Sequence, residues 1–416
     1  MKHTITSTGI DGTKANSTNL GKSNPQRLAF AVSLIAVLIS VSSLPCVAQT
    51  TVHQLSYNGK WIDQSLGVPL NRIDARDSAI TAFITTPNNQ KHVYFAEYPA
   101  GGYYNMHQET PSPISKTWND ENITQEAGGP NCSCRPTGFS IANQQYIFYE
   151  SDNDNHIHLL AYNNVKWSDQ DVTAAGHGSL PIGSTRLVAF PTTPNNQIHL
   201  FYTAAVSGGP GLGDIHQLFF NGVNWADEDL SAETGAIPTA LPPIAGFSNG
   251  NYQYVFYGDI FSHLHEMTYN NISWKDVDLT ARNGAPPVVA GGAAFVMPGT
   301  NALELFYHAS SSIIWLSSAD NLTWVSENLS TLTLSAEPDS YSLVAFPTSN
   351  NQIHVFYMGN SAKYFGEFSD VYQIYSSGCC WYSQNLTTDL GGKVPDPDVD
   401  IAGFAIGNQQ FVYYVH

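Results

Sequence analysis

The chain has 416 residues, of which 34 are acidic and 16 basic, so its formal net charge is −18 at pH 7. Charged residues make up 12% of the chain and aromatic residues another 12%, whereas about 25% of the residues in an ordinary soluble domain are charged. The aromatic content excludes an intrinsically disordered chain, and the acidic balance excludes an electrostatic surface for nucleic acid. So few charges also argue against long exposed helices, and we expect an all-β protein.

The first predicted element is a targeting segment. Residues 1–27 are polar and mostly basic, and an apolar run from residue 28 to about residue 44 leads to small residues around Ala48. This arrangement predicts a signal peptide over residues 1–48, cleaved near Ala48, and therefore a protein secreted to an extracellular or periplasmic compartment. The alternative is an uncleaved membrane anchor, because the run approaches membrane-spanning length. No other segment could span a membrane, so no membrane partner is expected after cleavage.

The rest of the chain is a repeat array. Seven Trp residues recur at intervals of 49 to 58 residues, and such a period indicates a solenoid or a propeller. Four short β-like segments recur between successive Trp residues: a small residue followed by Phe, an aromatic strand, a strand that often contains His, and the Trp strand. In one unit they are Gly246-Phe247, Tyr254–Tyr257, Leu264–Met267 and the strand that begins at Trp274. Turn pairs such as Asn221-Gly222 predict a hairpin between the last two strands.

Both ends of the array predict a closed ring. The C-terminus stops after the first two segments of a unit, at Phe411–Tyr414, and the N-terminus begins with the missing two, at Val52–Leu55 and Trp61. We therefore predict one domain over residues 51–416, an all-β seven-bladed β-propeller of four-stranded antiparallel blades. In this prediction the N- and C-terminal strands share one blade, and closure leaves only short, protected edges.

Residues that recur in every unit are expected to be structural first. The seven Trp residues fit this role, although an indole ring also suits the apolar face of a sugar. Two pairs, His156/His158 and His263/His265, place both imidazoles on one face of a strand, a geometry that could bind a metal ion. Because no third ligand recurs with them, we predict no metal site. The His residues are expected to hydrogen-bond their neighbours.

Pairs of acidic residues follow Trp at two and four residues in three units: Asp169/Asp171, Asp227/Asp229 and Asp276/Asp278. Paired carboxylates are what a glycosidase needs, but their recurrence favours hydrogen bonding in turns and between blades. The sequence also lacks a nucleophile elbow, a zinc-protease helix motif and a phosphate-binding loop. We therefore predict no catalytic residue and no cofactor.

Three units are longer than the others between the second and third strands, at Glu97–Asn105, Thr203–Asp214 and Met358–Val371. These insertions share one face of the predicted ring, which suits a binding surface. Two of them contain aromatic side chains: Tyr98, Tyr103, Tyr104, Tyr364, Phe365 and Phe368. In the fifth unit Trp315 stands where the repeat has His, and Glu304 stands where the second strand opens with His or Tyr. We therefore expect that unit to hold either a degraded or a specialised site.

Four cysteines follow the predicted cleavage point, in two pairs, Cys132/Cys134 and Cys379/Cys380. An oxidising compartment permits disulfides. Because the pairs fall in blades that are not neighbours, we expect each pair to react locally, if at all, and expect no shared zinc site.

The repeat resembles that of the fucose-specific lectin superfamily of β-propellers and that of seven-bladed bacterial propeller lectins. The likeness rests on aromatic strands such as His354–Tyr357, on His-containing strands such as Ile157–Leu160, and on Trp strands that end in a motif such as Asp278-Leu279-Thr280. It covers essentially all of residues 51–416. Those lectins bind monosaccharides in clefts between neighbouring blades, so the resemblance implies multiple inter-blade sites for glycans. By register, the resemblance places seven residues near such clefts: His158, Trp167, His216, Trp225, His265, Glu266 and Trp274.

The chain departs from the fungal fucose lectins, which have six blades and use an Arg and a Glu in each site. The matching positions here hold mostly His, Leu and Gln, and only Glu266 preserves the acid, so fucose does not follow as the ligand. We expect a secreted, non-catalytic, multivalent carbohydrate-binding propeller. The alternatives are a secreted polysaccharide hydrolase or lyase acting at the central channel, and a protein-binding scaffold that uses the three insertions.

Overall fold

The computed structural model describes residues 51–67, 79–97, 104–115, 117–133, 135–183, 186–206, 212–239, 241–360, 369–392, 395 and 400–416, with the backbone alone at 339–341. These residues belong to one compact unit, Gln49–His416. The predicted signal peptide, residues 1–48, lies outside the described residues. Among the helices of the described ranges, none is long and apolar enough to cross a bilayer.

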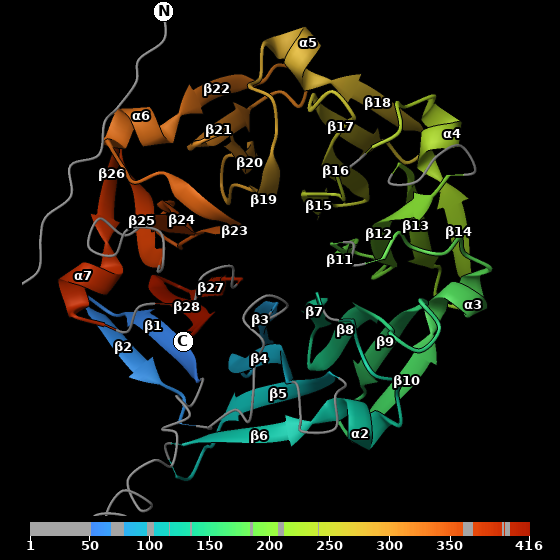
Figure 1. Ribbon diagram of the computed structural model, residues 1–416, viewed down its shortest axis with the longest axis horizontal. Coiled ribbons are helices and arrows are strands. Elements are labelled where there is room, and N and C mark those ends of the chain that lie inside the picture. The colour runs from blue at the N-terminus through green and yellow to red at the C-terminus, as the bar shows by residue number, and fades with distance from the viewer. Residues whose placement is uncertain are drawn as a thin grey trace, which may run out of the picture. The chain divides into compact units, whose positions relative to one another are not determined.

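Seven four-stranded antiparallel sheets form the blades of a ring (Figure 1). Blade 1 contains β3 (Ile80–Thr85), β4 (Gln90–Glu97), β5 (Asn105–Pro111) and β6 (Trp118–Asn122). Blade 2 contains β7 (Thr137–Ile141), β8 (Gln144–Glu150), β9 (Ile157–Tyr162) and β10 (Trp167–Asp171). Blade 3 contains β11 (Val188–Pro191), β12 (Ile198–Ala205), β13 (Gly213–Phe220) and β14 (Trp225–Asp229).

The next three blades repeat this order. Blade 4 contains β15 (Ala245–Asn249), β16 (Tyr252–Gly258), β17 (Leu264–Tyr269) and β18 (Trp274–Asp278). Blade 5 contains β19 (Ala290–Val296), β20 (Leu303–Ala309), β21 (Ser312–Ser318) and β22 (Val325–Asn328). Blade 6 contains β23 (Pro338–Pro347), β24 (Ile353–Asn360), β25 (Ser369–Ser377) and β26 (Cys380–Asn385).

Blade 7 is built from both ends of the domain. It contains β27 (Ala402–Ile406) and β28 (Gln409–Val415), followed in the sheet by β1 (Val52–Tyr57) and β2 (Trp61–Ser65). β1 pairs antiparallel with β28 from Val52↔Val415 to Tyr57↔Gln410. The predicted seven-bladed all-β propeller, closed by N- and C-terminal strands that share one blade, is therefore confirmed.

The first strands of the seven blades, β3, β7, β11, β15, β19, β23 and β27, surround the centre of the ring. Each packs against the first strands of both neighbouring blades, and the series returns from β27 to β3 (Figure 1). This convergence explains why a small residue precedes each Phe in the repeat. At Gly246, for example, a Cβ atom would lie 2.9 Å from the backbone oxygen of Tyr254 and 3.0 Å from the ring of Phe190.

The Trp side chains join neighbouring blades. Each of the seven periodic indoles lies edge-on against an aromatic ring from the second strand of the preceding blade, at interplanar angles of 72° to 87°. The pairs are Trp61–Phe356, Trp118–Tyr413, Trp167–Tyr94, Trp225–Phe148, Trp274–Phe201, Trp324–Phe256 and Trp381–Phe306. This edge-to-face geometry is favourable for aromatic pairs, so the period of the sequence is the period of the inter-blade packing.

Short helices, which the sequence did not predict, follow the outer strands of blades 1 to 6. They are α2 (Ile123–Ala127), α3 (Val172–Gly176), α4 (Leu230–Thr234), α5 (Leu279–Asn283), α6 (Leu329–Thr333) and α7 (Leu386–Leu390). An Asn or Asp side chain caps the N-terminus of each helix, and at α4 this residue is Asp229. One member of each predicted acidic pair therefore has a structural role as a helix cap.

The insertions between the second and third strands lie partly in the sheets. In blade 3 the insertion lengthens β12 to Ala205 and makes β13 begin at Gly213. In blade 6 it lengthens β24 to Asn360. The rest of each insertion, with Tyr98, Tyr103, Tyr364, Phe365 and Phe368, lies outside the described residues, whereas Tyr104 is described and half-buried.

The cysteines differ between the two pairs. Cys132 is fully buried and disulfide-bonded, whereas Cys379 and Cys380 are exposed free thiols whose Sγ atoms lie 3.1 Å apart. Cys134 lies outside the described residues.

Candidate functional site

Two clefts between blades share one design. The first lies between blades 3 and 4 and has a volume of about 250 Å³. The second lies between blades 6 and 7 and has a volume of about 180 Å³. Every residue that lines the second cleft has a counterpart at the same strand position in the first. The counterparts are Gln197 and Gln352, His199 and His354, Gln217 and Gln373, Phe219 and Tyr375, Glu228 and Gln384, Gln253 and Gln410, Tyr269 and Tyr57, and Trp274 and Trp61.

A hydrogen-bonded chain of polar side chains crosses each cleft from one blade to the next. In the first, Gln217 Nε2 donates to His199 Nδ1 at 2.5 Å and to Gln253 Oε1 of blade 4 at 3.1 Å. In the second, Gln373 Nε2 donates to His354 Nδ1 at 2.8 Å and to Gln410 Oε1 of blade 7 at 2.9 Å. The amides are thereby fixed in orientation before any ligand arrives.

The two cleft histidines, His199 and His354, are neutral near pH 7. Burial lowers the pKa of His199 and His354 to about 4. Since Nδ1 accepts from a Gln, the proton lies on Nε2, which is 3.3 Å from Thr192 Oγ1 in blade 3. The clefts are therefore polar but contain no imidazolium charge.

An aromatic wall completes the lining of both clefts, and in the first cleft two acidic side chains, Glu228 and Glu233, also line it. Trp274 and Tyr269 of blade 4 face the polar chain of blade 3. The indole of Trp274 hydrogen-bonds Glu228, and burial, followed by the charge of Glu233, raises the pKa of Glu228. In the second cleft Gln384 replaces this acid and donates to Gln373 Oε1. The first cleft is therefore the more acidic of the two.

Blades 1 and 2 repeat the polar chain a third time. Gln108 Nε2 donates to His92 Nδ1 at 2.5 Å and to Gln145 Oε1 at 3.0 Å. Burial again lowers the pKa of the His, here His92, to about 4. None of the other four junctions has the complete set: the junction of blades 7 and 1 keeps the central Gln as Gln54, but Phe411 and Lys91 occupy the other two positions. The seven blades are therefore structurally equivalent but their junctions are not.

The predicted ligand residues His158, His216 and His265 lie on the other face of their strands. Their Nδ1 atoms are 2.8 to 2.9 Å from carboxylate oxygens of Asp169, Asp227 and Asp276. The same three carboxylates accept hydrogen bonds from the buried hydroxyls of Tyr149, Tyr202 and Tyr257. Each of these three blades, 2, 3 and 4, thus holds a buried Tyr–Asp–His cluster, and none of the three His residues lines either cleft.

Among the other predicted residues, Trp274 lines the first cleft. Trp167 and Trp225 occupy the same strand position at the junctions of blades 1 with 2 and 2 with 3, where Trp225 Nε1 donates to Gln170 Oε1 at 3.2 Å. Glu266 lies at the junction of blades 4 and 5 and accepts a hydrogen bond from Trp324 Nε1 at 3.1 Å. Burial raises the pKa of Glu266 to about 7.

One group among the described side chains brings three metal-binding atoms within 4.8 Å of one another: Asp154, His158 and Asp171. Protein partners already occupy these side chains. His158 Nδ1 contacts Asp169, while Asp171 caps α3 through Oδ1 and lies 2.7 Å from His156 Nδ1 through Oδ2. Hydrogen bonding accounts for this cluster without a metal ion.

Sequence reasoning missed the Gln residues that connect the blades. On the third strand, Gln108, Gln217 and Gln373 each come directly after the position that holds His158 in blade 2. The second strand of the following blade has a Gln as its second residue. Aligning all seven units would have shown that Gln occupies both positions, one on each side of the junction, at three junctions between neighbouring units.

No protein-family model matches the chain, and no curated protein matches its sequence. In fold the chain is similar to a triple mutant of AofleA from Arthrobotrys oligospora, with a TM-score of 0.50 and 12% identity over 87% of this chain and 93% of that one. It is also similar to the six-bladed, fucose-recognising lectin of Aleuria aurantia, with a TM-score of 0.49 and 16% identity over 76% and 96% of the two chains. A sialidase from Trypanosoma rangeli gives a TM-score of 0.47 and 9% identity over 74% and 55%. The expected resemblance to lectin propellers holds at the level of the fold alone.

Proposed function

We propose that this chain is a secreted, non-catalytic carbohydrate-binding protein that holds single sugar residues in the clefts between its blades. The observation that carries the proposal is the repetition of one cleft, position by position, at two junctions. Fixed amide, imidazole and carboxylate groups suit the hydroxyls of a sugar, and the Trp and Tyr rings suit its apolar face. Both volumes lie below the roughly 300–1,000 Å³ of drug-sized pockets, which favours a monosaccharide unit over a longer ligand.

Binding is favoured over hydrolysis by the centre of the ring. A glycosidase uses two carboxyl groups that flank the scissile bond. Among the described residues that line the central cavity, Asp400 is the only acid, and it is ion-paired with Arg186 at 3.2 Å. This favours the lectin-like function over a polysaccharide hydrolase or lyase.

The test begins with a glycan array probed with the secreted form of the chain, followed by calorimetry with the monosaccharides that the array selects. Gln217→Leu and Gln373→Leu remove the donor at the centre of each cleft while keeping its volume. Each single variant should weaken binding at its own cleft by on the order of tenfold, and the double variant should weaken binding at both clefts by that factor. Gln409→Ala, at an exposed position on β28, is the matched control and should bind as the parent does.

Two results would contradict the proposal. One is the absence of binding to any glycan on the array and to any simple sugar at millimolar concentration. The other is an affinity unchanged in the Gln217→Leu/Gln373→Leu double variant, which would place the sugar elsewhere. Turnover of a polysaccharide by the parent protein would favour the enzymatic alternative.

A further inference from the structure

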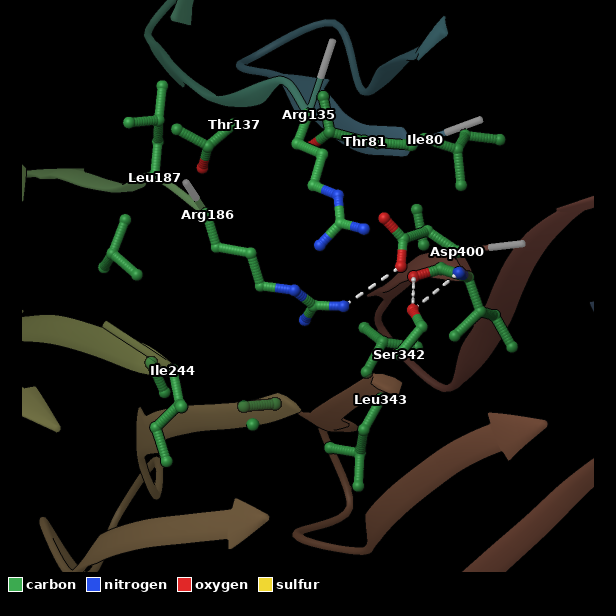
Figure 2. Close-up of a pocket in the computed structure, with 18 of the residues that line it drawn as sticks. Ile80, Thr81, Arg135, Thr137, Arg186, Leu187, Ile244, Ser342, Leu343 and Asp400 are labelled. Carbon is green, nitrogen blue, oxygen red and sulfur yellow. Dashed lines mark hydrogen bonds and ion pairs between the residues drawn. The ribbon is translucent and has the colours of Figure 1, made fainter. Parts of the chain in front are cut away.

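The first strands of all seven blades enclose a cavity of about 310 Å³ at the centre of the ring. Most of its wall is made of small and aliphatic residues, among them Ile80, Leu187, Ile244 and Leu343. Hydroxyl groups of Thr81 and Thr137 also face it (Figure 2). The exposed surface of the wall is nevertheless more polar than apolar, so the cavity can offer hydrogen-bond partners to a polar ligand.

The described charged residues of this wall are two arginines and one aspartate: Arg135, Arg186 and Asp400. All three side chains point into the cavity from different parts of the ring (Figure 2). Two positive charges therefore face one negative charge, in a chain whose formal net charge is −18 and which has only six Arg residues. An excess of positive charge here is the reverse of the chain's overall balance.

The ion pair between Arg186 and Asp400 leaves other guanidinium N–H donors of this group without a described partner. Arg186 Nη2 lies 3.2 Å from Asp400 Oδ1, and both side chains are about four-fifths buried, with exposures of 21% and 23%. Arg135 makes no ion pair or hydrogen bond with any other residue that the structure describes. The charge of Arg186 also acts on His308. Burial is the first cause that lowers the pKa of His308 to about 4, and the charge of Arg186 is the second.

We propose that the central cavity binds the anionic group of a ligand, held between the guanidinium groups of Arg135 and Arg186. A guanidinium presents several N–H donors in a planar fork that matches a carboxylate, sulfate or phosphate group. One such group would neutralise the excess charge while Asp400 keeps its contact with Arg186. This site is separate from the clefts between blades, and it does not depend on sugar binding there.

The test uses three probes with the full chain in calorimetry at low ionic strength. Glucuronate and glucose differ by a carboxylate, and inorganic sulfate represents the other oxyanions. Glucuronate, sulfate or both should bind with one saturable site that weakens as salt is added, whereas glucose should not bind at this site. Binding of glucuronate alone identifies a carboxylate ligand, and binding of sulfate alone identifies a sulfated or phosphorylated one.

Two variants move the affinity in opposite directions. Arg135→Gln should weaken anion binding by tenfold or more, because it removes a charged donor. Asp400→Asn should strengthen it severalfold, because it removes the competing carboxylate. Arg282→Gln, which removes an exposed charge on α5, is the control and should leave the affinity unchanged. Thermal unfolding of each variant separates loss of binding from loss of fold.

Absence of saturable binding of both anions to the parent protein would overturn the proposal. An affinity that neither Arg135→Gln nor Asp400→Asn changes would do the same, because it would place the anion outside the central cavity.

Discussion

Glu109 on β5 occupies a position where the other six blades have apolar side chains. The equivalent residues are Leu55, Leu160, Leu218, Met267, Leu316 and Ile374. Glu109 is fully buried, and neither carboxyl oxygen has a hydrogen-bond partner among the described atoms. Burial, followed by the charge of Asp120, raises the pKa of Glu109 to about 8. The side chain is therefore protonated in the folded state near neutral pH.

Glu109→Gln should stabilise the protein at alkaline pH and change little in acid. The pKa of Glu109 in the folded state is above its unfolded value of 4.5, so the parent loses stability as the pH rises from 4.5 through 8. The Glu109→Gln variant has no such loss, because an amide does not titrate. The difference in the free energy of unfolding should reach up to about 5 kcal/mol above pH 8. Urea unfolding at pH 4, 6 and 8.5 measures it, with exposed Glu327→Gln as the control. A difference that does not vary with pH would contradict this account.

Single residues also show how far the sequence predicts the site. The recurring acids were expected to hydrogen-bond in turns and between blades. Asp229 accepts a hydrogen bond in the turn that begins α4, whereas Asp227 accepts one from Tyr202 within its own blade. The cleft residues were harder to assign, because successive residues of a strand face opposite sides of the sheet. His216 and Gln217 are neighbours in the chain, yet His216 faces Asp227 while Gln217 faces the next blade. Only the register of the strands separates these two environments.

At the scale of elements, the sequence predicted the hairpins but not the helices. The turns before the outer strands have Asn164, Gly222 and Asn271 at φ of 71°, 95° and 71°, a region that Asn and Gly tolerate best. These residue types made the hairpins visible in the sequence. Each helix spans only five residues, which is too short to produce a helical period of apolar residues. The signal that remains is the cap, an Asp or Asn before a buried residue.

Asp229→Ala should destabilise the protein by about 1 kcal/mol, because it removes the acceptor for Ala232 N at the start of α4. Asp229→Asn keeps an acceptor oxygen at the same place and should lower the free energy of unfolding by at most a few tenths of a kcal/mol. Denaturant unfolding of the two variants side by side measures the cap. Equal destabilisation by both would assign the effect to the charge of Asp229 and not to the cap.

At the scale of the whole molecule, stability depends on the shared blade. β28 carries Val412, Tyr413 and Tyr414, which are almost fully buried against β1 and the neighbouring blades. Complete burial of such a side chain contributes roughly 1.5–3 kcal/mol, and a domain is stable by only about 5–15 kcal/mol in total. The closure of the ring was predictable because each end of the chain lacks what the other end supplies.

Deletion of residues 402–416 should therefore prevent cooperative unfolding, since it leaves β1 without its partner strand and opens the ring. Circular dichroism during heating, together with resistance to protease, measures the loss. Removal of residues 1–48, the predicted signal peptide, is the control and should leave the transition unchanged. A truncated chain that still unfolds in one sharp transition at the parent temperature would show that the seventh blade is dispensable.

The two equivalent clefts lie at the junctions of blades 3 with 4 and 6 with 7, three blades apart in one direction and four in the other (Figure 1). The two junctions therefore lie on nearly opposite sides of the ring. Two sugars bound there, as proposed above, would make one chain a bridge between two separate glycans, so that cross-linking of a glycan-coated surface would need no second copy of the protein.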